Sequence, residues 1–379
     1  MEYICRGCKA RLLSDNLIEF HNMPKSAQFF PSKEEIQSEQ GMDICLKECV
    51  YCGLVQAVGE PVPYYRDVIR ATSVSEEMKN FRITQYKEWV AKHNLFGEKI
   101  IEIGSGTGEY MEMMKQAGVK VFGLEHFKES VETGRKKGFE IFEGFIEDEK
   151  YNIPNAPYKG FYIMNFLEHI PNPVDFLRGI VNNLCEEAYG IVEVPNFDMM
   201  LKKSLYSEFI QDHLSYFTEK TLKNMLENNG FDVISCKSIW YDYILSAEVK
   251  RKKRTSVVGM IDNKQSLKEQ VKAYLKNKKN NGKKIATWGA GHQALANLSL
   301  LDMTEYIEVV IDSAKFKQDK YTPATHIPIV APEFLNTKDI DTVIVMAGGY
   351  SSEICRILED KYPWVEKVVL GEDGLYDKD

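Results

Sequence analysis

The sequence predicts an α/β protein built from three segments. Its 379 residues exceed the usual size of a single core, so two or three domains are expected. From about residue 61 onward, apolar stretches of strand length alternate with helical patterns, as in a doubly wound sheet. Paired cysteines mark the first sixty residues. We therefore expect a cysteine-rich domain over 1–60, an α/β domain over 61–250 and a further α/β domain over 260–379.

Composition and charge exclude several kinds of partner. The formal net charge of −8 argues against a nucleic-acid partner, which requires a basic surface. No apolar stretch approaches the length that spans a bilayer, and the opening residues "MEYICRGCKA" lack the basic and apolar regions of a signal peptide. We expect a cytoplasmic protein without a membrane partner. The oligomeric state stays open, with a monomer among the alternatives.

The cysteine-rich segment carries two Cys-x-x-Cys knuckles, Cys5 to Cys8 and Cys49 to Cys52. Their spacing lets both sulfurs of a knuckle face one point, so four thiolates can hold one tetrahedral ion. Such a closed site predicts a structural zinc. Cys45 lies outside both knuckles and is expected to be a small buried hydrophobe. The alternative is that the four cysteines are reduced and bind no metal.

The middle segment opens with a glycine-rich turn. The strand "KIIEI" runs into Gly104-Ser105-Gly106-Thr107-Gly108, and an amphipathic helix follows. Glycines let a ligand approach the backbone, and the helix N-terminus presents free N–H groups. The next strand ends at Glu125, about twenty residues on, where an acid reaches ribose hydroxyls. The pattern predicts a cofactor that contains adenosine.

The form of this turn, "EIGSGTG" with Glu102 before the glycines, resembles motif I of class I S-adenosylmethionine-dependent methyltransferases. The stretches "FEIFEGFIE" and "FYIMNFLEHIP" match later elements of that family in the same order. The resemblance implies a class I methyltransferase fold for the middle segment and a set of residues that contact S-adenosylmethionine: Glu102, Gly104, Ser105, Gly106 and Gly108 at the turn, Glu125 at the ribose, Gly144 and Phe145 at the adenine, and Asn165 and Phe166 beside the methionine part.

The last segment uses a similar design. The strand "KKIATW" precedes Gly289-Ala290-Gly291-His292-Gln293-Ala294, and the later strand "IEVVID" ends at Asp312. A G-x-G-x-x-A turn with an acid about twenty residues on is typical of dinucleotide binding. A nicotinamide dinucleotide is therefore one alternative for this segment.

Together, the three segments resemble the nucleotide-sugar C-methyltransferases of deoxysugar biosynthesis, which include dTDP-sugar C-3-methyltransferases. "CVYCGLVQ" is similar to the end of that family's zinc-binding domain, and "WGAGHQALANLSL" and "YTPATHIPIVAPEFL" to its C-terminal domain. The resemblance implies a Rossmann-like C-terminal domain that helps to hold a nucleotide-sugar without a nicotinamide cofactor.

Methylation of carbon needs a nucleophile that the enzyme must first create. In a 4-keto sugar a base removes the acidified C-3 hydrogen, and the enolate attacks the methyl group. The resemblance implies His213, in "DHLSYF", as the base and Asp212 as a residue that orients the site. His169, in "NFLEHIP" beside the expected cofactor site, is a candidate donor to the enolate oxygen. Tyr64 and Tyr65 resemble an aromatic element of the family that reaches the sugar.

Each of these residues also has a purely structural interpretation. His169 can serve packing or cofactor closure, and one of the two tyrosines can be an ordinary core aromatic. Thr218 is a candidate helix N-cap, which would leave His213 in a solvent-facing loop. The family commonly has glutamate and tyrosine where this chain has Asp212 and Ile210, so the sugar and the methylated position are where this chain is expected to differ.

Three functions remain in competition. The first is an S-adenosylmethionine-dependent C-methyltransferase that acts on a nucleotide-linked keto-deoxysugar. The second is an O- or N-methyltransferase for a related sugar or small natural product. The third is a zinc-dependent binding protein that keeps the fold without turnover. Proton exchange at C-3 without S-adenosylmethionine separates the first two, because only C-methylation requires that proton to be removed.

Overall fold

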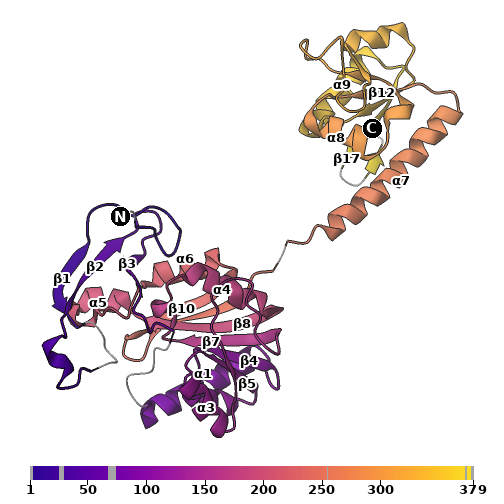
Figure 1. The fold of residues 1–379 in the computed structure, drawn as a ribbon. Helices are drawn as coiled ribbons and strands as arrows, with labels where there is room; N and C mark the ends of the chain where they lie inside the picture. The colour runs from indigo at the N-terminus through magenta and orange to yellow at the C-terminus, as the bar shows by residue number, and fades with distance from the viewer. Residues whose placement is uncertain (1–2, 25–29, 67–73, 254, 372–373, 377–379) are drawn as a thin grey trace. The chain divides into compact units, whose positions relative to one another are not determined.

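A computed structural model describes residues 3–24, 30–66, 74–253, 255–371 and 374–376. The chain divides into two compact units, Met1–Lys253 and Arg254–Asp379, which are described separately (Figure 1). The predicted boundary near residue 60 lies inside the first unit and stays a prediction. Among the described helices, none combines the length and the apolarity needed to cross a membrane.

The cysteine-rich segment forms a small antiparallel sheet with a strand from far along the chain. Its order is β1-β2-β3-β9, with bounds β1 Ile18–Met23, β2 Met42–Glu48, β3 Val55–Ala57 and β9 Ser215–Tyr216. Val55 pairs with Tyr216 and Gln56 with Ser215. The N-terminal segment is therefore joined by backbone pairing to the stretch that follows His213.

The central sheet of the first unit has seven strands in the order β10-β11-β8-β7-β4-β5-β6. The strands β4 to β8 are parallel, and β10 and β11 are antiparallel additions at one edge. The order reverses between β4 and β7, which is the place where open α/β sheets bind ligands. The bounds are β4 Lys99–Ile103, β5 Lys120–Glu125, β6 Glu140–Glu143, β7 Tyr158–Met164, β8 Leu184–Pro195, β10 Phe231–Ile239 and β11 Ile244–Arg251.

Helices cover both faces of this sheet: α1 and α3 lie on one face, and α4 and α6 on the other (Figure 1). Thr218 caps α6 and forms a reciprocal capping box with Thr221, so the predicted N-cap is confirmed. The bounds are α1 Glu76–Lys92, α2 Glu109–Lys115, α3 Lys128–Lys136, α4 Pro173–Asn182, α5 Phe197–Lys203 and α6 Glu219–Asn228, with short 3₁₀ turns η1 Glu35–Gln37, η2 Leu167–His169 and η3 Tyr206–Glu208.

One hydrophobic core runs from the cysteine-rich segment into the central sheet. It contains Cys5, Cys49 and Leu54 together with Phe217 and Leu222 from the end of the first unit. These side chains are almost completely removed from water, and burial of each large apolar group contributes roughly 1.5–3 kcal/mol. The cysteine-rich segment thus depends on the central sheet for much of its packing.

The second unit is a smaller α/β domain with the strand order β14-β15-β13-β12-β16-β17-β18. The strands β15, β13, β12, β16 and β17 are parallel, which confirms the predicted Rossmann-like design. The bounds are β12 Ile285–Trp288, β13 Ile307–Ile311, β14 Lys320–Tyr321, β15 Pro328–Val330, β16 Thr342–Val345, β17 Glu366–Gly371, β18 Gly374–Tyr376, α7 Val258–Asn280, α8 His292–Leu300, α9 Ser351–Lys361, η4 Thr304–Tyr306, η5 Pro332–Thr337 and η6 Gly348–Tyr350.

Candidate active site and cysteine cluster

The glycine-rich turn lies between β4 and α2 and fits closely against aromatic rings. Gly104 has φ +76°, and a Cβ atom there would lie 2.9 Å from the ring of Phe166. Gly108 has φ +89°, and a Cβ atom would lie 2.7 Å from the ring of Phe139. Both positions therefore require glycine for two reasons, the left-handed backbone and the close ring. The turn lies at the switch point of the sheet, packed against two aromatic rings.

Glu125 ends β5 with its carboxylate held by the backbone. One carboxylate oxygen accepts a hydrogen bond from the Gly106 N–H at 2.8 Å, and the other accepts one from the Phe127 N–H at 2.9 Å. Burial raises the pKa of this carboxyl, and the two N–H groups partly oppose the shift. Each carboxylate oxygen keeps a second lone pair, so the group can accept ribose hydroxyls in a fixed orientation.

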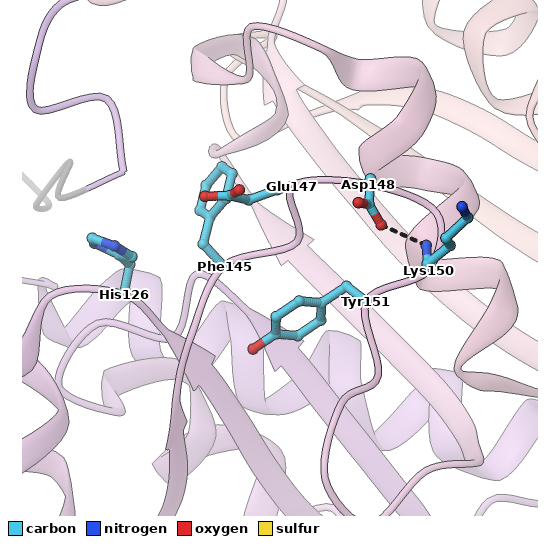
Figure 2. Close-up of a pocket in the computed structure, with 6 residues that line it drawn as sticks. All are labelled: His126, Phe145, Glu147, Asp148, Lys150 and Tyr151. Atoms are coloured by element: carbon cyan, nitrogen blue, oxygen red, sulfur yellow. Dashed lines mark hydrogen bonds between the residues drawn. The ribbon is translucent and has the colours of Figure 1, made fainter.

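A pocket beside Glu125 is lined by a mixture of aliphatic and aromatic side chains. Its inner part is lined by Gly104, Glu125, Gly144, Phe145 and Phe166, all predicted cofactor contacts, together with Ile103, Leu124, His126, Ile146 and Phe176. Figure 2 shows its outer part, with His126 and Phe145 on one side and Tyr151 pointing toward the centre. Apolar and aromatic side chains thus surround the end of β5 that carries Glu125.

Two residues of this pocket escape the sequence analysis. The His126 ring meets the Phe145 ring edge to face, with centroids 6.2 Å apart. Tyr151 places its hydroxyl where a Cβ atom on Gly144 would stand, only 1.9 Å away, so Gly144 makes room for it. His126 directly follows the ribose acid, which is a usable signal in the sequence. Nothing in the sequence singles out Tyr151.

Other predicted cofactor contacts do not line the described pocket. Glu102 is fully buried beneath the turn and accepts a hydrogen bond from the Tyr162 hydroxyl at 3.0 Å. Asn165 has φ +50°, and its amide oxygen is buried without a hydrogen-bond partner among the described residues. An unpaired buried oxygen in a left-handed backbone is a costly arrangement that points to a ligand. Ser105, Gly106 and Gly108 belong to the turn itself.

Beside Asn165, a buried ion pair joins α1 to β8. An Nη atom of Arg82 lies 2.6 Å from one Glu193 carboxylate oxygen and 2.8 Å from the other, and both side chains are completely buried. Gln85 and Ser246 also donate to Glu193. The main-chain N–H of Asn165 bonds the Glu193 carbonyl, so this pair fixes the strand end that carries Asn165. Sequence analysis gives no sign of this ion pair.

The two candidate catalytic histidines, His169 and His213, lie next to each other. The rings of His169 and His213 have centroids 4.9 Å apart and meet edge to face. His169 is buried and His213 half-buried, so His213 is not a solvent-facing loop residue. Burial lowers the pKa of both rings, and for His213 the neighbouring His169 lowers it further. His213 is thereby held neutral, with a lone pair available.

Asp212 acts on this pair through its backbone. Its carbonyl oxygen lies 2.8 Å from Nδ1 of His169. Because a carbonyl only accepts, Nδ1 carries the proton, and Nε2 of the neutral ring is then an acceptor. Donation from His169 to an enolate oxygen would require the ring to be charged, which its burial opposes. That predicted role of His169 remains untested, and this geometry does not favour it.

Next to the histidines, Glu168 is an additional candidate that sequence analysis misses. Its side chain is buried, and burial raises the pKa of the carboxyl to about 8. One carboxyl oxygen lies 3.8 Å from Nε2 of His169, and the other has no hydrogen-bond partner among the described residues. Ile210 lies in the segment that leads to His213, and the Tyr216 hydroxyl forms hydrogen bonds with both the N–H and the carbonyl of Ile210.

The two predicted tyrosines differ in what they contact. Tyr65 packs edge to face on Phe145, with centroids 5.8 Å apart, and so lies beside the pocket that Phe145 lines. Arg66 extends over both rings and pairs with Glu147 at 2.7 Å. Tyr64 is half-buried. The predicted contact of Tyr65 with the sugar stays a prediction.

The four knuckle cysteines converge on one point. Their sulfur atoms all lie within 4.8 Å of one another, with Cys5 3.6 Å from Cys52 and Cys8 3.5 Å from Cys49. A tetrahedral zinc with Zn–S bonds of about 2.3 Å requires sulfurs about 3.8 Å apart, so the donor set and spacing fit zinc. Cys45 lies outside the cluster and is half-buried rather than buried.

In the second unit, the turn after β12 repeats the arrangement at Glu125. The Asp312 carboxylate accepts hydrogen bonds from the N–H groups of Ala290 and Ala314, both at 2.8 Å. It also pairs with Lys317 at 2.9 Å, and these contacts together hold its pKa below the usual range against the effect of burial. Lys317 contacts the same carboxylate oxygen as the Ala290 N–H, which has no counterpart at Glu125.

Two family models match the chain in succession. A methyltransferase domain matches residues 76–236, and a C-methyltransferase C-terminal domain matches residues 248–370. The chain is 24% identical over 286 residues to C-methyltransferase NovU of Streptomyces niveus. This alignment covers 68% of this chain and 68% of NovU. It is 35% identical over 169 residues to a ubiquinone biosynthesis O-methyltransferase of Vibrio atlanticus (strain LGP32). That alignment covers 39% of this chain and 69% of the O-methyltransferase.

Among solved structures, a SAM dependent methyltransferase from Aquifex aeolicus matches 46% of this chain and 93% of its own. The TM-score is 0.36 and the identity 15%.

Proposed function

Because the chain is an S-adenosylmethionine-dependent methyltransferase, we propose that it methylates a carbon atom of a nucleotide-linked keto-deoxysugar, at C-3, through an enolate. The observation that carries the proposal is the position of the two histidines. η2 begins directly after Phe166, which lines the cofactor pocket, and it ends at His169. His213 contacts His169, so a neutral base lies one short turn from the cofactor.

The cofactor has a matching set of protein groups. Glu125 accepts the ribose hydroxyls, the Phe145 and His126 rings flank the base, and the turn at Gly106, where a Cβ atom would meet only the Glu109 carboxylate at 3.6 Å, leaves room for the methionine part. S-adenosylmethionine, when bound, supplies an electrophilic methyl group. His213 removes the C-3 proton with its lone pair, and such a base contributes roughly 10²–10⁴-fold to the rate. Exclusion of water by Phe166 and Phe176 strengthens the electrostatic contacts inside the site.

Asp212 and Tyr216 position the base. The main-chain carbonyl of Asp212 fixes the ring of His169, against which His213 packs. Tyr216 bonds the backbone of Ile210 and so fixes the other end of the loop. The side chains of Ile210 and Asp212 are where we place the chain's own sugar preference.

The cysteine cluster is proposed to hold a structural zinc, because four thiolates close the coordination sphere and leave no position for a substrate. The second unit is proposed to hold the nucleotide part, with the Gly289 turn facing its phosphates. The presence of a C-methyltransferase C-terminal domain over residues 248–370 supports this role. The cytoplasmic location expected from the sequence stays a prediction.

The test is a panel of nucleotide-linked sugars, keto and non-keto, on thymidine, guanosine and cytidine diphosphate carriers. Each is incubated with the full chain and S-adenosylmethionine, and the mass gain of one methyl group is measured. We expect methylation of a keto sugar only. The same sugar, in deuterated solvent without S-adenosylmethionine, is expected to exchange its C-3 hydrogen.

An O-methyltransferase is the second candidate, since the O-methyltransferase of Vibrio atlanticus is 35% identical over 169 residues. It predicts a methyl group on oxygen and no exchange at carbon. Methylation of non-keto sugars without exchange would replace the C-methylation proposal. A binding protein without turnover is set aside, because the chain is an enzyme.

A further inference from the structure

Three side chains outside the cysteine cluster converge beside the cofactor pocket. Glu168, His169 and His213 each offer one carboxylate oxygen or imidazole nitrogen, and these atoms all lie within 4.8 Å of one another. Glu168 and His169 are buried and His213 is half-buried. Two imidazoles and one carboxylate at such spacing are a donor set that transition metals use with open positions left over.

The backbone holds the three groups together. The three residues come from two segments, 167–169 and 212–214, and the Leu214 N–H donates to the Glu168 carbonyl at 2.8 Å. His169 adds a second tie, from Nδ1 to the Asp212 carbonyl. A histidine that binds metal generally donates its other N–H to a carbonyl or carboxylate, which fixes the ring. This tie leaves Nε2 of His169 as the atom that faces Glu168.

Glu168 supplies an independent sign of a missing ligand. Its side chain is 98% buried, and the outer oxygen Oε2 has no hydrogen-bond partner among the described residues. Oε1 lies 3.8 Å from Nε2 of His169, too far for a hydrogen bond. A buried carboxyl oxygen without a partner is costly, and coordination to a cation removes that cost.

We propose that Glu168, His169 and His213 form a binding site for a divalent transition-metal ion of the Zn²⁺, Co²⁺ or Ni²⁺ class. Imidazole suits these ions, whereas Mg²⁺ prefers an all-oxygen shell. An ion about 2.1 Å from each donor requires donors roughly 3–3.5 Å apart, so the side chains draw together by about an ångström on binding. Three protein donors leave at least one coordination position for a substrate oxygen or water.

While the ion is bound, His213 cannot act as the base, because metal coordination and proton removal use the same lone pair of its imidazole. The metal-bound chain and the proton-accepting chain are therefore alternative states of one cluster. The inference does not depend on the proposed reaction, since ion binding is measured without turnover.

The test uses the full chain with its cysteine cluster loaded with zinc. Co²⁺ is titrated by calorimetry, and visible absorption reports the ligands. We expect one further Co²⁺ per chain, without the charge-transfer absorption that thiolate ligands give. His213→Ala and Glu168→Gln should each weaken this binding by roughly tenfold or more. His126→Ala is the matched control, a histidine that lines the cofactor pocket outside the cluster, and it should bind Co²⁺ as the natural chain does.

Circular dichroism checks that each variant folds, and the half-buried position of His213 keeps the test usable if Glu168→Gln does not fold. No Co²⁺ beyond the cysteine-bound ion would overturn the proposal. Unchanged affinity in His213→Ala would overturn it as well, and so would an equal loss in His126→Ala. Displacement of Co²⁺ by excess Mg²⁺ would contradict the assigned class of ion.

Discussion

The Nδ1 atom of His169 lies 2.8 Å from the main-chain carbonyl oxygen of Asp212. The contact sets the tautomer of His169 and links the loop after β7 to the loop that carries His213. It also shows that Asp212 contributes through its backbone, which an exchange of its side chain leaves in place. The separate roles of the site residues can therefore be tested by substitutions that change one contact at a time.

Substitution of His213 and substitution of His126 should affect different steps, catalysis in the first case and cofactor binding in the second. His213→Ala should lower kcat by roughly 10²–10⁴-fold, because the base is removed, while the Kd of S-adenosylmethionine stays unchanged. His126→Ala should raise that Kd, because one wall of the base pocket is lost, and leave kcat at saturation close to normal. Turnover assays paired with calorimetry separate the two. Near-normal turnover in His213→Ala would remove His213 as the base.

Glu125→Gln should weaken the binding of S-adenosylmethionine by roughly 10–100-fold, since a hydrogen bond to a charged group is worth about 1.5–3 kcal/mol. In the natural chain, burial raises the pKa of this carboxyl, so it takes up a proton at a higher pH than an ordinary glutamate. Affinity should therefore fall as the pH is lowered through that raised pKa, and the Gln variant should lose this dependence. Equal affinities of the natural chain and Glu125→Gln for S-adenosylmethionine would show that Glu125 does not bind the ribose.

Gly104→Ala and Gly138→Ala form a matched pair. Both glycines have positive φ, +76° and +87°, so alanine costs each about 1–2 kcal/mol in backbone energy. Nothing lies within 4 Å of a Cβ atom at Gly138, whereas at Gly104 it meets the Phe166 ring. Gly104→Ala should therefore unfold at a lower denaturant concentration than Gly138→Ala and bind S-adenosylmethionine more weakly. Indistinguishable variants would mean that the Phe166 ring yields freely.

The cysteine cluster should bind one zinc per chain. Cys49→Ser should abolish zinc binding and lower the melting temperature. Metal binding contributes folding free energy where a small segment has little core of its own. Cys45→Ser is the control, because Cys45 lies outside the cluster, and it should keep its zinc. Elemental analysis and thermal unfolding report both effects. Zinc retained at full stoichiometry in Cys49→Ser would contradict the assigned ligands.

The buried Arg82–Glu193 pair should be expensive to break. Arg82→Met leaves the Glu193 carboxylate without its cation, at a cost of about 3–5 kcal/mol. The double variant Arg82→Met, Glu193→Gln should recover part of that loss, because no unpaired charge remains and Gln85 and Ser246 still offer hydrogen bonds. Urea unfolding of the single and double variants measures the coupling. A purely additive loss would show that the pair is not coupled.

The sequence predicts those parts of the site that lie within one βαβ unit. Glu125 and Gly106 are joined by a short crossover, so their contact follows from local pattern, and the same holds for Asp312 and Ala290. The Thr218 cap is local too. The contact of His169 with the 212–213 loop spans 43 residues and depends on how that loop is anchored, which no local signal encodes. The orphaned oxygen of Glu168 is likewise visible only once burial is known.

The strand β9, Ser215–Tyr216, pairs with β3 from the cysteine-rich segment. It begins two residues after His213, so the loop that carries His213 is joined to a sheet whose other three strands lie within the first sixty residues. A chimera that grafts only the central sheet onto another scaffold would therefore inherit the cofactor pocket but lose the anchor of its base. A transfer to another scaffold would therefore need the whole of the first 253 residues, because the cysteine-rich segment supports the loop that carries His213.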